Sequence, residues 1–185
     1  MASKIDLISN AMILIGDEPI NSLTGEGRAA KVGSNLYDNI VQNELSKHRW
    51  GFARRKAQLA LTTETIIDSE YNSSYQLPTD LITLIKIKPN TNYQIYGDKV
   101  YCNQTSAVYC DYIANVSESE WPVYFSKMIE YALATDFASS IRDSAASADR
   151  MSAMYLNASR MARATDSMQH PPTPMVSNPF VSVRY

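Results

Sequence analysis

Apolar residues near the start of the chain recur at helical spacing. The first set consists of Ile5, Ile8, Met12 and Ile15. This spacing predicts an amphipathic helix that ends at Gly16, and Ser3 with Asp6 resembles a capping box at its start. A loop is expected over 17–27, which contains one proline and two glycines.

A second apolar set follows this loop. It consists of Val32, Leu36, Ile40 and Leu45. The intervening positions are mostly polar, so a second amphipathic helix is predicted from near Gly27 to 48–51.

From residue 52 the pattern becomes typical of strands. Runs rich in Leu, Ile, Val, Thr and Tyr occupy 59–67, 71–77, 81–88 and 107–113. Gly97 and Asp98 lie between two further short runs, and this pair predicts a β-hairpin because glycine in first position suits a two-residue turn. The sequence therefore predicts a β-rich insert over 52–115.

Helical spacing returns after residue 116. Ser117 with Glu120 resembles a second capping box, and Pro122 suits the first turn of a third helix. A break is expected over 143–148. A fourth helix should then present one face that consists of Met151, Met154, Tyr155, Ala158 and Met161.

The last segment, 168–185, differs from the rest because it contains four of the eight prolines. Proline at this density excludes a helix. The segment also has apolar residues that a purely solvated tail would lack: Met175, Val176, Phe180, Val181, Val183 and Tyr185. We expect it to be an extended tail that docks on a neighbouring protein.

These elements predict an α+β fold that is mainly α. The expected architecture is a four-helix bundle with a β-rich insert between the second and third helices. Residues 1–51 and 116–167 would form the bundle as one discontinuous domain, 52–115 the insert, and 168–185 the tail. A length of 185 residues suits one domain with a small insert.

Composition limits the function classes. The net charge of −2 excludes a globally basic protein, and no apolar run approaches the roughly 20 residues of a membrane span. The protein is expected to be made in the cytoplasm. Two cysteines and two histidines make neither a disulfide scaffold nor a convincing zinc site. If 104–107 turns a hairpin, Cys102 and Cys110 would face each other, where a reducing compartment favours two buried thiols over a disulfide.

No convergent catalytic set is recognisable. The histidines available as a base are His48, beside basic residues, and His170, in the proline-rich segment. Neighbouring carboxylates such as Glu118 and Glu120 leave a glycan hydrolase as an alternative, although the third helix start also explains that pair. The sequence predicts a protein that is not an enzyme and that holds no cofactor or metal.

The densest basic stretch is 47–56, where aromatic residues alternate with cations. Trp50 and Phe52 are more typical of core anchors with the cations turned to solvent. The alternative is a small nucleic-acid-binding protein that uses this stretch. The candidate contacts to phosphate or to an adjacent subunit are Arg49, Arg54, Arg55 and Lys56.

Several loop and packing motifs follow one another in a recognisable order. They are 15–20, Ser22 with Leu23, Tyr37 with Asp38, 48–53, 75–81 and Trp121 with Pro122. In order and spacing, over roughly 5–165, they resemble the tail tubular protein A family of short-tailed bacteriophages. The wider group of head-to-tail adaptors has C-terminal segments similarly rich in Pro, Ser and Asn.

The resemblance implies a helical bundle with a β insert that assembles as a ring, usually of twelve subunits, in the virion. Such a ring joins the portal protein to the tail nozzle and surrounds a channel through which genomic DNA passes without sequence-specific contacts. The implied partners are the portal, a nozzle protein of the tail tubular B type, further copies of the chain and DNA. No membrane and no cofactor are implied.

Overall fold

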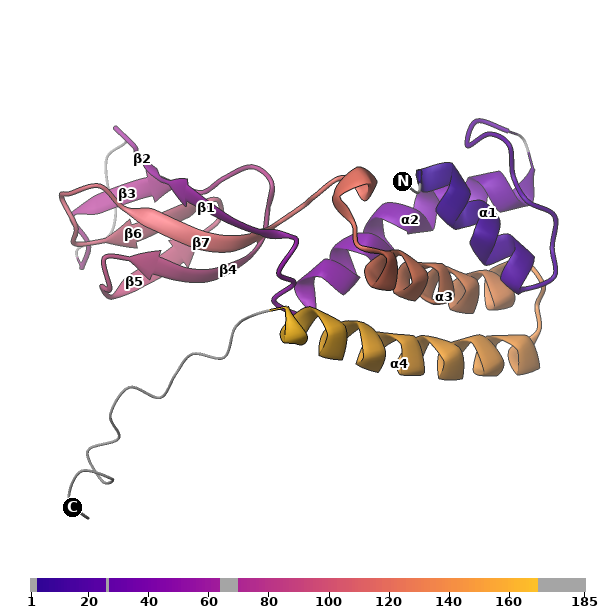
Figure 1. Ribbon diagram of the computed structural model, residues 1–185. Helices are drawn as coiled ribbons and strands as arrows, with labels where there is room; N and C mark the ends of the chain where they lie inside the picture. The colour runs from indigo at the N-terminus through magenta and orange to yellow at the C-terminus, as the bar shows by residue number, and fades with distance from the viewer. Residues whose placement is uncertain (1–2, 26, 64–69, 170–185) are drawn as a thin grey trace, which may run out of the picture.

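The computed structural model describes residues 3–25, 27–63 and 70–169. Its helices lie at both ends of the described chain and its strands between them (Figure 1). The helices are α1 (Lys4–Leu14), α2 (Arg28–Ser46), α3 (Val123–Ser140) and α4 (Ala145–Met168). Helix α3 contacts the other three helices and contributes most of its apolar side chains to the core.

The strands form two antiparallel sheets. The first has the order β1 (Arg54–Gln58), β7 (Tyr109–Ala114), β4 (Leu81–Lys88). The second has the order β2 (Ala60–Leu61), β3 (Ser73–Gln76), β6 (Lys99–Cys102), β5 (Tyr93–Tyr96). Figure 1 shows both sheets at one end of the molecule and the helices at the other.

The predicted mainly α fold, a four-helix bundle with a β insert, is wrong. The described residues contain seven strands in two sheets, and these strands bury a substantial apolar set of their own. That set includes Leu59, Tyr75, Ile87, Val100, Val108, Cys110 and Tyr112. The fold is therefore α+β, and the two sheets are a principal part of it. The prediction gave too much weight to helical periodicity, which does not reveal the core built by alternate residues of the strands.

The capping box at the start of α1 is confirmed. The Ser3 hydroxyl accepts the Asp6 backbone N–H at 3.2 Å, and the Ser3 backbone N–H donates to the Asp6 carboxylate at 2.9 Å. These bonds from Ser3 lower the pKa of Asp6. The helix thus begins at a residue that the sequence identified, and it buries Leu7, Ile8, Ala11 and Met12.

The second predicted capping box is wrong. Residues Glu118–Glu120 form a short 3₁₀ helix, η1, whose preceding Ser117 makes no capping bond. Helix α3 begins later, with Pro122 as its N-cap. Glu120 instead forms an ion pair with Arg55.

The break predicted over 143–148 lies earlier, over 141–144, where Asp143 has φ 48° and Ser144 caps α4. Residues 145–148 are already part of α4. The predicted face of α4 is only partly correct. Met151 is buried, but Met154 and Met161 are 42% and 64% exposed. Ser159, Ala162 and Asp166 are buried in their place.

The predicted hairpin around Gly97 is confirmed as β5–β6, with Tyr96 opposite Lys99. The conditional hairpin between the two cysteines is not formed. Cys102 lies on β6, which pairs with β3 and β5, whereas Cys110 lies on β7, between β1 and β4. Both are free buried thiols, and burial raises the pKa of Cys110.

Two tryptophans fix the connections between helices and sheets. Trp50 precedes β1 and Trp121 precedes α3, and each packs edge-on against Phe125 of α3 with ring centroids 5.0 Å apart. Their indole N–H groups donate to the carbonyls of Glu44 and Val116 at 2.9 and 3.1 Å. These contacts hold the three-stranded sheet in place relative to α3.

Candidate functional site

Strand β1 divides the predicted basic cluster between its two sides. Arg54, Lys56 and Gln58 are exposed and alternate with the half-buried Arg55 and Ala57. Successive side chains of a strand point to opposite faces, so Arg54 and Lys56 share a face that Arg55 does not. The fourth predicted residue, Arg49, is exposed in the connection before the strand.

Arg55 serves a structural contact. Its guanidinium donates to the Phe52 carbonyl at 3.1 Å and forms an ion pair with Glu120 of η1. It therefore ties the first strand to the segment that leads into α3. Arg55 and Arg54 consequently have different roles although they are adjacent in sequence.

Asp111 lies at the centre of the three-stranded sheet and is surrounded by cations. In the register of β1, β7 and β4 it is opposite both Lys56 and Lys86. Its Oδ2 lies 3.4 Å from Arg54 Nη2 and 3.4 Å from Lys86 Nζ, and its Oδ1 lies 3.8 Å from Lys56 Nζ. The Asp111 side chain is 5% exposed, whereas those of the three cations are 41–61% exposed.

The charge of Asp111 depends on these neighbours. Burial acts to raise the pKa of this carboxyl, but the hydrogen bond from Lys86 and the positive charges of Lys56, Lys86 and Lys88 outweigh it and lower the pKa. Within the described part of the chain, Oδ1 accepts no hydrogen bond. One carboxylate is thus shared by more cations than it can neutralise.

Lys88 and Tyr109 extend this surface. They are opposite each other in the β4–β7 register, two residues from Lys86 and Asp111 respectively, and both are exposed. We call the surface the basic face and define it by Arg54, Lys56, Lys86, Lys88, Tyr109 and Asp111. Among these described residues, four cations surround a single carboxylate.

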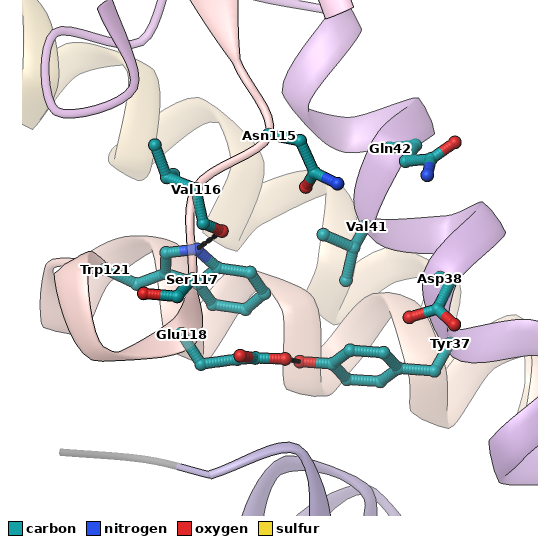
Figure 2. Close-up of a pocket in the computed structure, with 9 residues that line it drawn as sticks. All are labelled: Tyr37, Asp38, Val41, Gln42, Asn115, Val116, Ser117, Glu118 and Trp121. Atoms are coloured by element: carbon teal, nitrogen blue, oxygen red, sulfur yellow. Dashed lines mark hydrogen bonds between the residues drawn. The ribbon is translucent and has the colours of Figure 1, made fainter. Parts of the chain in front are cut away.

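A cleft of about 540 Å³ lies between α2 and the segment that joins β7 to α3 (Figure 2). In Figure 2 the Tyr37 ring points toward Glu118, and its hydroxyl donates to Glu118 Oε1 at 3.0 Å. Burial and the nearby Glu118 charge raise the pKa of Tyr37. The other lining residues are Asp38, Val41, Gln42, Asn115, Val116, Ser117 and Trp121.

The cleft does not unite the two carboxylates of the hydrolase alternative. Glu118 accepts the Tyr37 hydroxyl, while Glu120 pairs with Arg55. Asp38 also lines the cleft, and it forms an ion pair with Lys4 at 2.8 Å. Each of these acids therefore has a structural partner.

His48 is part of a buried structural cluster around Asp166 of α4. His48 Nε2 lies 3.5 Å from Asp166 Oδ2, and its ring packs edge-on against Trp50. Asp166 also accepts the Gly51 backbone N–H at 3.1 Å and the Tyr124 hydroxyl at 2.9 Å. This cluster joins the end of α4 to α3 and to the connection before β1.

Over 3–25, 27–63 and 70–169, no group of three or more His, Cys, Asp or Glu side chains is placed to hold a metal ion. No helix within those ranges is both long and apolar enough to cross a bilayer.

The predicted docking residues of the tail lie outside the described residues. They are Met175, Val176, Phe180, Val181, Val183 and Tyr185.

Of the six residues of the basic face, only Arg54 and Lys56 were predicted as contacts. Lys86 and Lys88 are about thirty residues from the cluster at 47–56, and only the pairing of β1 and β4 with β7 brings them to it. Alternation along 81–88 puts both lysines on one side of a strand, together with Ile82 and Leu84. The missing information was which strands are neighbours.

Neither a protein-family model nor a curated protein matches this chain.

Proposed function

We propose that this chain is a structural subunit of a short-tailed phage virion, a head-to-tail adaptor. In this proposal, copies of the chain form a ring, of twelve subunits in the family it resembles, between the portal and the tail nozzle. Genomic DNA passes through the channel of that ring. The support from sequence is the ordered set of motifs between 15 and 122.

The structural observation that most favours the proposal is an apolar row on α4. Met154, Met161 and Met168 are seven residues apart and are 42%, 64% and 82% exposed. Residues seven apart lie on nearly the same side of a helix. Exposed methionines in a row are typical of a surface that becomes covered by another protein, and a ring subunit needs such surfaces.

The contacts of the acidic residues favour a structural role over catalysis. Glu118 and Glu120 are bound to separate partners, and His48 lies against Asp166 and Trp50. A hydrolase needs an acid and a base that converge on one substrate position. We therefore propose a non-enzymatic subunit that requires no cofactor.

A second candidate function is a small nucleic-acid-binding protein, and the basic face favours it. The two functions differ in their assembly. The adaptor forms a ring by itself or on the portal, whereas the small binding protein would retain DNA as a monomer.

The proposed contact between tail and portal can be tested by truncation. Full-length protein and a protein ending at Ser167 are mixed with purified portal rings and sedimented. We expect the full-length chain to sediment with the portal and the truncated chain to remain in the supernatant, with unchanged circular dichroism. Undiminished binding of the truncated chain would show that the tail is not the docking element.

A matched control separates apolar docking from the mere presence of a tail. Replacing Phe180, Val181 and Val183 by Ser should weaken co-sedimentation, because these side chains supply the apolar area that docking would bury. Replacing the polar Thr173, Ser177 and Asn178 by Ala should leave it unchanged. If neither full-length protein nor the control variant binds portal rings, the adaptor proposal fails.

A further inference from the structure

We propose that the basic face binds the phosphodiester backbone of nucleic acid. The face is the outer surface of the β1–β7–β4 sheet, with cations on both outer strands and Asp111 on the central one. It is a binding surface defined by the fold, since its two halves come from distant parts of the sequence. The inference deepens the proposed function, but it can be tested on the isolated chain.

The cations form two rows, one on β1 and one on β4. Arg54 and Lys56 on β1, and Lys86 and Lys88 on β4, are each two residues apart, which corresponds to about 7 Å along a strand. The rows lie on either side of β7, about 10 Å from each other. A polyanion that follows the strands would meet positive charge on both sides.

Asp111 organises these cations without cancelling them. It is buried beneath them and contacts three, so it holds their side chains over the sheet while the net charge of the face stays positive. Its Oδ1 accepts no hydrogen bond from any described residue, and Lys56 remains at 3.8 Å. Within the described part of the chain, the Lys56 ammonium is thus held by a long ion pair alone, and its donors can reach an incoming phosphate oxygen.

Tyr109 favours nucleic acid over an acidic protein segment as the ligand. Its ring is 41% exposed and lies in register between Gln58 and Lys88. An exposed aromatic ring beside cations on a sheet can stack a base while the cations contact the backbone. An acidic peptide would use the cations but would gain little from the ring.

The test uses fluorescence anisotropy with a labelled twenty-nucleotide DNA, single-stranded and as a duplex. The full-length chain should bind, and its affinity should fall steeply as salt increases, because phosphate binding releases counterions. The double variant Lys56→Glu/Lys86→Glu should lose about tenfold or more in affinity. Tyr109→Ala should weaken binding to the single strand more than binding to the duplex.

The control variant has the same net charge but changes exposed cations elsewhere. Lys31→Glu/Arg160→Glu alters α2 and α4, and it should retain most of the affinity. Asp111→Asn should bind several-fold more tightly, since it removes the only carboxylate of the face. Circular dichroism establishes that each variant is folded.

Three results would overturn the inference. They are no DNA binding by the full-length chain at low salt, an equal loss in the control variant, or competition by polyglutamate as effective as that by unlabelled DNA. The last result would assign the face to an acidic protein partner. A chain that binds DNA through this face but never forms a ring would remove the adaptor proposal and leave this inference standing.

Discussion

Asp111 illustrates how one buried side chain can set the properties of a surface. Its carboxylate is opposite Lys56 and Lys86 on the two neighbouring strands and also within 3.4 Å of Arg54. Lys56 and Lys86 lie on the two strands that flank β7, and their positive charges repel each other. The negative charge of Asp111 between them offsets this repulsion. The residue therefore stabilises the sheet and keeps the cations in one cluster.

We predict that Asp111→Asn lowers the free energy of unfolding at pH 7 by about 1–2 kcal/mol, a modest loss because the cations are partly solvated. The pKa of Asp111 is lowered in the folded protein. Its ionised form therefore stabilises the fold above the unfolded pKa of about 3.9, and this contribution disappears as the pH falls through the folded value. Urea unfolding of both proteins between pH 7 and pH 3 should show their difference shrinking below about pH 4.

A difference that stays constant down to pH 3 would contradict this assignment. Lys31→Gln is the matched control, since it removes an exposed charge distant from the sheets and should change stability little at any pH.

Gly33 is required by close packing between α1 and α2. A Cβ at this position would lie 2.9 Å from Ile8 Cγ2 and 3.3 Å from Ile8 Cδ1, and Ile8 is fully buried. In an exposed helix interior, glycine to alanine stabilises by about 1 kcal/mol. Here the clash with a branched, immobilised side chain outweighs that gain.

We predict that Gly33→Ala destabilises the protein by about 1–2 kcal/mol, the net of overpacking and helix propensity. In the double variant with Ile8→Ala, the added methyl group should cost nothing further, because the atoms it meets are gone. Chemical denaturation of the single and double variants measures this coupling. Additive effects would show that Gly33 and Ile8 are not in steric conflict.

At the scale of the elements, the sequence predicted where the helices lie better than it predicted which of their residues are buried. The start of α1 follows from Ser3 and Asp6, and the turn of the β5–β6 hairpin follows from Gly97. The face of α4 did not follow, because the helix buries small and polar residues such as Ser159, Ala162 and Asp166. Periodicity assigns large apolar residues to the core, yet Met161 remains outside.

The strands could also be recognised from the sequence, but their neighbours in the sheet could not. Alternation along 81–88 indicates a strand, but it does not say that β7 will lie between β1 and β4. Arg54 and Lys56 were therefore predicted as candidate contacts, while Lys86 and Lys88 were not. The mainly α prediction failed for a related reason, since the extent of two paired sheets depends on contacts between distant segments.

The end of α4 is held by Asp166, and we predict that Asp166→Ala destabilises the protein by about 2–4 kcal/mol. The substitution leaves the Gly51 N–H and the Tyr124 hydroxyl without their buried acceptor. Asp149→Ala, an exposed change on the same helix, should cost less than about 0.5 kcal/mol. Thermal and urea unfolding of both variants measure the difference, and equal effects would mean that the buried contacts contribute nothing.

At the scale of the whole molecule, the two candidate interaction surfaces lie on different parts of the structure. The two sheets occupy one end of the molecule, and α4 runs along the helical end (Figure 1). The basic face lies on the first part and the apolar row of α4 on the second. A subunit with this arrangement can use its helices for protein contacts and its three-stranded sheet for nucleic acid.

The most direct test of the adaptor proposal is the native mass of the full-length protein, measured alone and after mixing with portal rings. The chain has a mass of 20.7 kDa. The account predicts a closed assembly whose mass is a fixed multiple of this value, twelvefold in the family it resembles, either in the free protein or on the portal. A protein that remains a monomer in both samples, with portal rings unchanged in mass, would contradict it.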